Sequence, residues 1–321
     1  MRKLLVNVKL SDDQIASIRQ VSPELEVMRE LDPDKARREA RDAEILLCFQ
    51  LPGPLEEASS LRWIQLVSAG AEHLLEAGVD RSNVLVTTAS GIHGTAMAEY
   101  ALCTMIMLAR RMPLLLRESE RHQWKPSRPR TYYGEELWGK TLGILGLGAI
   151  GQRVASVARC VGMRVIGLRR SGNTEGLPPG LVDTVYRPDS LLEMLAESDF
   201  VFVALPLTPE TRGLLGEREL RAMKRTAFLV NVSRGLIVDE SALARALREG
   251  WIAGGAFDVF AQEPLPADSE IWDLPNLIVT PHMAGGTVPY LDRAADLFLD
   301  NLGRYLAGRP MVNVLDKSRG Y

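Results

Sequence analysis

The feature that most constrains this chain is the stretch Lys140–Gly151, where an apolar segment runs into three spaced glycines and then into a helical pattern. Thr141–Leu145 is apolar and partly β-branched, which predicts a buried strand. The glycines follow as Gly146-x-Gly148-x-x-Gly151. A strand, a glycine turn and a helix in this order are typical of a unit that holds a dinucleotide pyrophosphate at the helix N-terminus. We therefore expect a dinucleotide here; the alternative is a glycine-rich turn in another α/β protein.

Around this turn the chain alternates strand-like and helical patterns, which predicts parallel sheets covered by helices on both faces. Six strands are expected between Thr141 and Thr280, the number in two mononucleotide-binding halves, and four more before Ser90. The expected strands are Leu4–Val8, Glu44–Phe49, Trp63–Val67, Val84–Thr88, Thr141–Leu145, Arg164–Leu168, Phe200–Leu205, Phe228–Val232, Gly254–Val259 and Leu277–Thr280. The clearest helices are Asp12–Gln20, Ala96–Arg110, Gln152–Ala158, Ser190–Ser198, Thr287–Leu306 and Glu240–Glu249, the last capped by Asp239 and Gly250.

Length and helix character indicate two domains. A chain of 321 residues can form two cores of ordinary size. Ala96–Arg110 is apolar around a single acid, Glu99, which predicts a buried helix that bridges the domains. The amphipathic Thr287–Leu306 follows the last expected strand, so we expect it to cross back to the first domain.

The segment Arg111–Glu136 differs from its neighbours because it is polar and contains prolines and aromatic side chains. A surface loop is one interpretation. An arm that packs on another surface, for instance a second subunit, is the other, because aromatic side chains are enriched in interfaces. The residues concerned are Trp124, Pro126, Pro129, Tyr132 and Tyr133.

Composition narrows the class of partner and compartment. A formal net charge of −3 gives no general attraction to nucleic acid or to an anionic membrane. The longest apolar run, Ala101–Ala109, is shorter than the roughly 20 residues that span a bilayer. The three cysteines, Cys48, Cys103 and Cys160, are scattered, which indicates a reducing compartment rather than disulfides or a zinc site. We expect a cytoplasmic protein without a bound metal.

Polar residues follow the last three expected strands, where an open α/β sheet binds its ligands. They are Arg234, Asp258 with Glu263 beyond it, and His282. A forked guanidinium suits a carboxylate, and a histidine can protonate a carbonyl oxygen as a hydride arrives from a nicotinamide. A neighbouring carboxylate would orient the ring and favour its protonated form. Taken singly, each residue could instead be structural or solvated, so the prediction rests on the set.

Long stretches of this chain match, in the same order, the pattern of one known family: Gly139–Gly151, Leu205–Thr211, Asn231–Glu240, Phe257–Leu265 and Thr280–Gly285. Over these stretches, about half its length, the chain resembles the D-isomer-specific 2-hydroxyacid dehydrogenase family. The resemblance implies that Arg234 holds the substrate carboxylate and keto oxygen, that His282 is the acid/base with Glu263 as its partner, and that Asp258 contacts the nicotinamide side.

The same resemblance implies a fold and two sets of contacts. The fold is α/β with two doubly wound parallel sheets, a Rossmann cofactor domain (97–283) inserted in a flavodoxin-like substrate domain (1–96 and 284–321). The family also implies hinge closure and a homodimer. The implied cofactor contacts are Gly146, Gly148, Ala149, Ile150, Gly151, Arg169, Arg170, Ser171, Leu205, Pro206, Thr211, Val232, Arg234, Asp258, His282 and Gly285; the implied substrate contacts are Ser68, Ala69, Gly70, Arg234 and His282.

One substitution in the substrate loop departs from the family pattern. Val67–Glu72 resembles the loop whose backbone N–H groups receive the substrate carboxylate, and the family commonly has aspartate where this chain has Glu72. Further pocket candidates, from position alone, are Phe49–Leu51 and Trp124.

The choice of cofactor depends on the end of the second strand of the cofactor domain. An acid there would bind the ribose 2′-hydroxyl of NAD, whereas arginine accommodates the 2′-phosphate of NADP. The sequence is Leu168-Arg169-Arg170-Ser171, with no acid before Glu175. Two guanidinium groups and a hydroxyl suit a phosphate dianion, so NADP(H) is favoured and NAD(H) remains possible.

Three functions fit these residues. The first is an NADP(H)-dependent reductase of small 2-oxo acids, with glyoxylate or hydroxypyruvate as substrates by resemblance. The second is a 3-phosphoglycerate dehydrogenase, which is less favoured because the sequence ends at Tyr321 without the regulatory domains that many such enzymes carry. The third, from another class, is a nucleotide-sensing protein similar to the C-terminal-binding protein corepressors.

Overall fold

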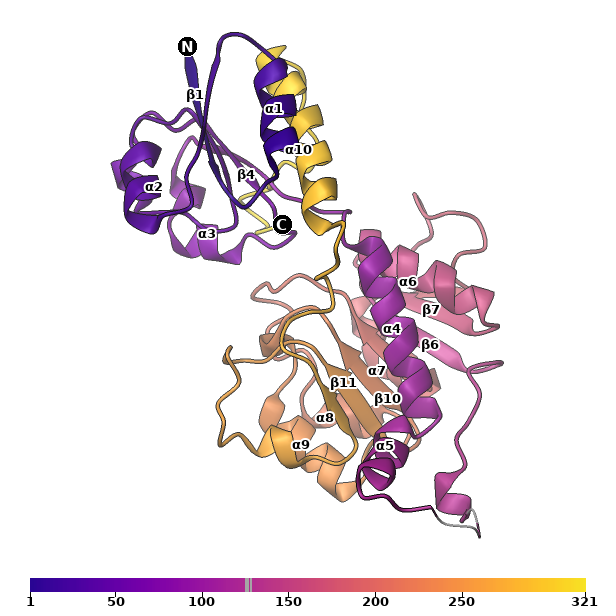
Figure 1. The fold of residues 1–321 in the computed structure, drawn as a ribbon. Helices are drawn as coiled ribbons and strands as arrows, with labels where there is room; N and C mark the ends of the chain where they lie inside the picture. The colour runs from indigo at the N-terminus through magenta and orange to yellow at the C-terminus, as the bar shows by residue number, and fades with distance from the viewer. Residues whose placement is uncertain (125–126, 128) are drawn as a thin grey trace. The chain divides into compact units, whose positions relative to one another are not determined.

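The computed structural model describes residues 1–124, 127 and 129–321 and divides into two compact units. Unit 1 contains Met1–His93 and Thr287–Tyr321, and unit 2 contains Gly94–Gly286 (Figure 1). Unit 2 is therefore one uninterrupted segment inserted between the two parts of unit 1. Each unit is built on one sheet, as the predicted fold class requires.

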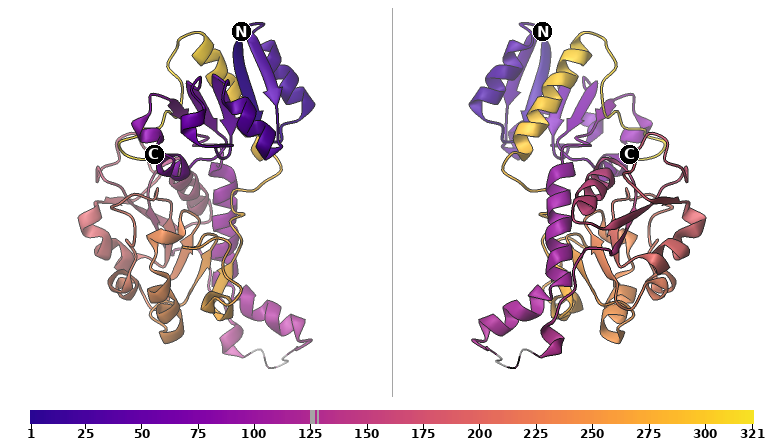
Figure 2. Two further views of the ribbon diagram at one scale, coloured as in Figure 1. Left: turned by 90° about the vertical axis from the view of Figure 1, so that its left-hand side faces the viewer. Right: turned by 90° about the vertical axis from the view of Figure 1, so that its right-hand side faces the viewer.

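Unit 1 has a five-stranded parallel sheet in the order β2-β1-β3-β4-β5. Leu4 and Val6 pack in a cluster with α1 and α10, whereas Leu5 packs with α2 and α3. Successive side chains of the strand therefore contact helices on opposite faces of the sheet (Figure 2). The elements are β1 (Arg2–Asn7), α1 (Asp12–Gln20), β2 (Leu25–Arg29), α2 (Pro33–Ala40), β3 (Ile45–Cys48), β4 (Trp63–Leu66), α3 (Glu72–Glu76), β5 (Leu85–Thr87) and α10 (Tyr290–Leu306).

The expectation of four strands in unit 1 was wrong, because it omitted β2. This strand pairs only with β1 and forms the edge of the sheet. Only Leu25 in it is buried, so its Leu-Glu-Val-Met-Arg sequence lacks the continuous apolar run that identifies β3. Edge strands are half-solvated, and this weakens their hydrophobic pattern.

A buried polar network ties the returning helix α10 to the sheet of unit 1. Gln65 and Asn301 are at most 1% exposed, and the Asn301 side-chain nitrogen donates to Gln65 Oε1 over 2.9 Å. Thr87 donates to the same oxygen over 2.7 Å and accepts from Trp63 Nε1 over 2.8 Å. Asn301 Oδ1 accepts from the backbone N–H of Val312 over 2.9 Å. Buried amides need such partners, so the network fixes how α10 docks.

Unit 2 has a seven-stranded parallel sheet in the order β12-β11-β10-β9-β6-β7-β8. Helices α4 and α6 lie side by side on one face, and α7, α8 and α9 cover the other (Figures 1 and 2). The elements are α4 (Gly94–Ala109), α5 (Met112–Glu120), β6 (Thr141–Leu145), α6 (Ala149–Cys160), β7 (Arg164–Leu168), β8 (Thr184–Tyr186), α7 (Leu191–Glu197), β9 (Phe200–Val203), α8 (Glu217–Ala222), β10 (Phe228–Asn231), α9 (Glu240–Glu249), β11 (Gly254–Phe257) and β12 (Leu277–Val279). Short 3₁₀ turns occur in both units. Unit 1 contains η1 (Leu55–Glu57) and η2 (Val79–Arg81), and unit 2 contains η3 (Arg130–Tyr132), η4 (Pro188–Ser190), η5 (Gly235–Ile237) and η6 (Glu270–Asp273).

The expectation of six strands here was also wrong by one. The additional strand, β8, has three residues, none of them fully buried, and lies at the edge beside β7. Helix α9 begins and ends as predicted, with the Asp239 side chain accepting from Ala242 N over 3.0 Å and Gly250 in the left-handed conformation at its end.

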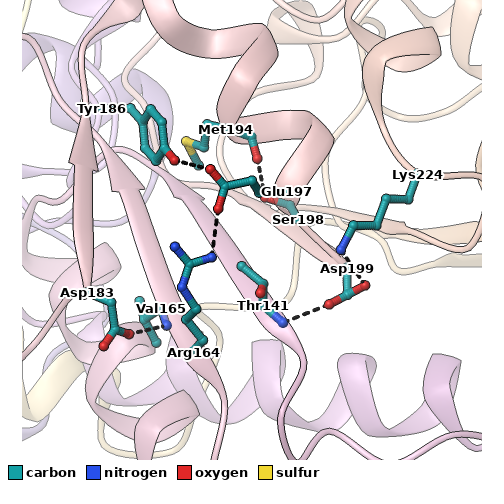
Figure 3. Close-up of polar contacts among 10 residues, drawn as sticks. All are labelled: Thr141, Arg164, Val165, Asp183, Tyr186, Met194, Glu197, Ser198, Asp199 and Lys224. Atoms are coloured by element: carbon teal, nitrogen blue, oxygen red, sulfur yellow. Dashed lines mark hydrogen bonds and ion pairs between the residues drawn. The ribbon is translucent and has the colours of Figure 1, made fainter.

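The amino ends of the strands in unit 2 are closed by carboxylates (Figure 3). Asp199 accepts from the backbone N–H of Thr141 over 2.8 Å and from Lys224 Nζ over 2.9 Å. Asp183 accepts from the N–H of Val165 over 2.8 Å. These contacts satisfy the N–H of the first residue of β6 and that of the second residue of β7, so this edge of the sheet stabilises the fold.

The segment Arg111–Glu136 contains α5 and η3 and keeps its aromatic side chains at the surface. Trp124 is 85% and Tyr133 61% exposed, while the Tyr132 hydroxyl donates to Glu118 over 2.8 Å. Pro126 lies outside the described residues. Contact of this arm with a second subunit stays a prediction.

Among the helices of the described residues, none has the length and apolar character needed to cross a bilayer.

Replacing Asn301 by leucine should destabilise unit 1. The change removes one of the two donors to Gln65 Oε1 and leaves the backbone N–H and oxygen of Val312 without the Asn301 side chain, which costs about 2 to 4 kcal/mol. Urea unfolding followed by circular dichroism would measure it. The control, Gln20→Leu, changes an exposed amide and should leave the midpoint within error. Equal stability of both variants would show that the network contributes nothing.

Candidate active site

The polar residues predicted in unit 2 lie at one edge of its sheet. Strands β10, β11 and β12 are neighbours and end at Asn231, Phe257 and Val279. Arg234, Asp258 and His282 follow these ends within three residues. Because parallel strands end at a common edge, the three side chains arise from adjacent positions.

His282 and Glu263 are in direct contact. His282 Nδ1 lies 2.7 Å from Glu263 Oε2, and Glu263 Oε1 accepts from the backbone N–H of Phe260 over 2.9 Å. An ionised carboxylate can only accept, so Nδ1 carries a proton and Nε2 is the nitrogen that can exchange one with a ligand. The two side chains are 48% and 37% exposed, so a small molecule can reach the pair.

Asp258 is fully buried, and its carboxylate is engaged by the loop that carries His282. Oδ1 accepts from the Thr280 hydroxyl over 2.5 Å and from Met283 N over 2.8 Å, and Oδ2 accepts from Ala284 N over 2.8 Å. Its backbone oxygen accepts from His282 N over 2.8 Å. Asp258 thus shapes the turn from Thr280 to Ala284. The implied contact of Asp258 with the nicotinamide side stays a prediction.

Arg234 lies in a loop that packs on the segment leading to Glu263. Its Nη1 donates to the Ser233 oxygen over 2.7 Å. A Cβ on the following Gly235 would lie 1.9 Å from the carbonyl carbon of Phe260, so only glycine allows this approach. The Ser-Arg-Gly sequence therefore has a packing reason, and it links the Arg234 loop to the backbone that holds Glu263.

The glycine turn has the geometry that a pyrophosphate requires. Gly146 has φ = 99°, and a Cβ there would lie 2.5 Å from the oxygen of Ala204. A Cβ on Gly151 would lie 2.0 Å from the oxygen of Gly146, so helix α6 and strand β6 pack tightly. A Cβ on Gly148, by contrast, would meet no heavy atom of the described residues within 4 Å. The turn is thus closed beneath Gly146 and Gly151 and open above Gly148, at the N-terminus of α6, where phosphate groups bind.

The two arginines after β7 have different surroundings. Arg169 Nη1 donates to the backbone oxygen of Glu175 over 2.8 Å, and so shapes its own loop. Arg170 faces the loop after β9: the pKa of Glu210 lies below its usual value mainly because Thr208 donates to it, and in part because of the positive charge of Arg170. From the sequence alone, both arginines were predicted to bind the 2′-phosphate in the same way.

The other cofactor residues implied by the family occupy the same edge. Leu205, Pro206 and Thr211 follow β9, and the Thr211 hydroxyl donates to the Pro206 oxygen over 2.6 Å. Val232 directly follows β10, and Gly285 lies beyond β12. All five therefore follow carboxyl ends of strands in unit 2.

The predicted substrate loop belongs to unit 1. Ser68, Ala69 and Gly70 follow β4, and the Ser68 hydroxyl donates to the oxygen of Gly70 over 2.9 Å. The hydroxyl of Tyr290, on α10, donates to the Val67 oxygen over 2.7 Å and supports the loop. Glu72 is the first residue of α3. Contact of this loop with a substrate stays a prediction.

Three residues that support these loops were not predicted as site residues. Tyr290 was predicted only as part of a helix, although it supports the loop after β4. Tyr100 and Thr280, whose hydroxyls lie 2.7 Å apart, were not selected as site residues either. A hydroxyl contact across 180 residues leaves no local pattern.

A parallel sheet with a closed glycine turn and a histidine–carboxylate pair at the same edge defines a dinucleotide-dependent oxidoreductase. The model of one family, described as D-isomer specific 2-hydroxyacid dehydrogenase, NAD binding domain, matches residues 102–284. The chain belongs to this family, which confirms the resemblance.

Individual relatives agree with this assignment. The glyoxylate reductase of Aeropyrum pernix is 38% identical over 267 residues, which cover 82% of this chain and 78% of the relative. The D-3-phosphoglycerate dehydrogenase of Methanocaldococcus jannaschii is 32% identical over 322 residues, which cover 98% of this chain and 60% of the relative. The structure of an NADPH-dependent glyoxylate/hydroxypyruvate reductase from Sinorhizobium meliloti, in complex with NADP and sulfate, is 25% identical with a TM-score of 0.85 over the full length of both chains.

Alanine at Gly148 and at Gly151 should have opposite effects. Gly148→Ala adds a methyl group in open space, so the melting temperature should be unchanged while affinity for NAD(P)H falls at least roughly 10-fold, since the methyl group blocks the phosphate approach. Gly151→Ala should lower the melting temperature because its Cβ overlaps the Gly146 oxygen. Thermal melts and NADPH fluorescence titrations would test both, with Gly303→Ala on α10 as a control that leaves cofactor affinity intact. Unchanged cofactor affinity in Gly148→Ala would contradict the placement of the pyrophosphate.

Proposed function

We propose that this protein is an NADP(H)-dependent reductase of small 2-oxo acids, with glyoxylate and hydroxypyruvate as the substrates to test first. The observation that carries the proposal is the accessible His282–Glu263 pair, 2.7 Å apart, at the strand edge that also presents Arg234. Support for the substrate class comes from the A. pernix and S. meliloti relatives, whose names give glyoxylate reduction.

The proposed roles follow from the chemistry of each group. The bound nicotinamide would supply a hydride to the carbonyl carbon. The forked guanidinium of Arg234 would hold the substrate carboxylate and stabilise the negative charge that develops on the keto oxygen. His282 Nε2 would give its proton to that oxygen, which completes a 2-hydroxy acid. Glu263 would keep the imidazole oriented and stabilise its positive charge before the transfer.

The preference for NADP(H) rests on Arg170 and Ser171. A 2′-phosphate is a dianion, and Arg170 is a cation that faces the loop after β9, where its charge helps to lower the pKa of Glu210. We assign the larger share of phosphate binding to Arg170 because its charge faces the loop after β9. Arg169 Nη1 donates to the backbone oxygens of Asn173 and Glu175 and shapes its own loop. The NADP complex of the S. meliloti relative supports the same choice.

We also propose a homodimer, formed through the arm and the outer face of α4. Large apolar side chains are exposed there, and such groups on one surface favour a partner. They are Ile106 (42% exposed) on α4 and Leu116 (46%), Trp124 (85%) and Tyr133 (61%) in the arm. A cytoplasmic location stays a prediction; it is compatible with Cys48, Cys103 and Cys160 as free thiols.

A second candidate, 3-phosphoglycerate dehydrogenase, is supported by the M. jannaschii relative. It uses the same reaction centre and differs in a substrate phosphate. A nucleotide-sensing protein of the corepressor type would bind the cofactor and turn over none of these acids. A panel of glyoxylate, hydroxypyruvate and 3-phosphohydroxypyruvate, followed by loss of NADPH absorbance at 340 nm, separates all three.

His282→Gln should abolish most of the reductase activity. Removing a general acid typically lowers kcat by about 10²- to 10⁴-fold, and the amide cannot carry the proton. NADPH affinity, measured by fluorescence, should change little. His122→Gln, in the exposed arm, is the matched control and should retain the wild-type rate. A His282→Gln protein with full activity would exclude this residue as the acid.

Arg170→Ala should change cofactor preference more than Arg169→Ala does. Loss of a charge-assisted contact to the 2′-phosphate costs about 1.5 to 3 kcal/mol, which raises the KM for NADPH roughly 10- to 100-fold and leaves that for NADH nearly unchanged. Arg169→Ala should loosen the loop and affect both cofactors similarly, because its guanidinium binds backbone oxygens. Equal effects of Arg170→Ala on both cofactors would remove the argument for NADP(H).

A further inference from the structure

His282 has a backbone conformation that does not persist without support. Its φ is 56°, in the left-handed region, which a residue with a Cβ adopts at a cost. The imidazole of the proposed acid therefore projects from a turn that the surrounding structure must hold. What holds the turn also determines where Nδ1 meets Glu263.

The first support is Asp258. Its carboxylate and backbone oxygens together accept from Thr280, His282, Met283 and Ala284, so one buried residue contacts both sides of the turn. Asp258 is 0% exposed, and a buried carboxylate depends on such donors. If one donor were lost, the carboxylate would bind the remaining loop less firmly.

The chain of hydrogen bonds extends one step further, to α4. The Tyr100 hydroxyl lies 2.7 Å from Thr280 Oγ1. Thr280 has a single hydroxyl proton and donates it to Asp258, so Tyr100 must be the donor to Thr280. Burial raises the pKa of Tyr100 to about 12, and the negative charge of Asp258 acts in the same direction, so the phenol keeps its proton at neutral pH. The bonds run Tyr100 to Thr280 to Asp258, and aligned bonds strengthen one another.

Tyr100 is also held in place. It lies on α4, where the neighbouring Ala98, Ala101 and Met105 are at most 1% exposed and belong to the core of unit 2 with Ile144 and Val230. The hydroxyl is thus fixed to a packed helix rather than to another loop. A rigid helix on one face of the sheet is connected to the turn that bears His282.

We propose that Tyr100 is a positioning residue for the reaction, which acts through Thr280 and Asp258 to hold the left-handed turn of His282. It contacts neither the histidine ring nor the carboxylate of Glu263; it restrains the backbone beneath them. The proposal rests on the proposed function, since it assigns Tyr100 a part in proton transfer by His282. It also predicts a structural effect that does not depend on turnover.

Tyr100→Phe, which removes one hydroxyl and keeps the ring, tests the proposal. We expect kcat for the reduced 2-oxo acid to fall roughly 2- to 10-fold, the loss that one hydrogen bond accounts for, with the KM for NADPH unchanged. Thr280→Val should lower kcat at least as far, and Thr280→Ser, which keeps the hydroxyl, should restore it. Tyr186→Phe is the matched control: its hydroxyl binds Glu197, and it lies on β8, the outermost strand on the side of the sheet away from β12 (Figure 3), so kcat should not change.

A double-mutant cycle separates the chain of bonds from two independent effects. If Tyr100 acts through Thr280, the Tyr100→Phe/Thr280→Val variant should be no slower than Thr280→Val alone. Multiplied losses, or an unchanged kcat in Tyr100→Phe, would overturn the proposal.

Hydrogen–deuterium exchange provides the readout that is independent of activity. The amides of His282, Met283 and Ala284 donate to Asp258, so they should exchange faster in Tyr100→Phe and in Thr280→Val than in wild type or Tyr186→Phe. A wild-type protein that reduces none of the acids would refute the proposed function and leave this test intact. Unchanged exchange in both variants would refute the positioning role even if the enzyme is active.

Discussion

The direction of the strands is the constraint on which the site depends. In a parallel sheet all amino ends meet at one edge and all carboxyl ends at the other. In unit 2 the carboxylates of Asp199 and Asp183 accept from backbone N–H groups at the amino ends of β6 and β7. The opposite edge is left to the glycine turn and to the loops that carry Arg234 and His282. One edge stabilises the sheet and the other is available to ligands.

At the carboxyl edge the reactive groups are held through backbone contacts. Gly235 lets the Arg234 loop touch the backbone of Phe260, and the N–H of Phe260 fixes Glu263. Asp258 secures the turn of His282 from below. The side chains that we propose to contact the substrate thus depend on neighbouring residues for their position, which is how a site keeps its geometry before any ligand binds.

The sequence predicted those parts of the fold in which a local residue pattern is typical of a single structure. Strand β6, the glycine turn and helix α9 are local, and each glycine or cap has a geometric reason that is visible in the residue types. Strands β2 and β8 were missed because both are edge strands with incomplete burial. The bonds Tyr100–Thr280 and Gln65–Asn301 could not be found because they join residues 180 and 236 positions apart. The strand-end residues and the partner Glu263 could be predicted, and the supporting hydroxyls of Tyr100, Thr280 and Tyr290 could not.

The insertion of unit 2 within unit 1 also determines which unit can fold first during synthesis on the ribosome. Gly94–Gly286 is continuous, so every contact of its sheet can form before α10 has been synthesised. The core of unit 1 can be completed only later, because Phe298 and Leu302, which cover Trp63 and the sheet face around it, are synthesised near the end of the chain. During that interval an apolar sheet face of unit 1 is exposed to chaperones or to aggregation, while all residues of unit 2 have already been synthesised.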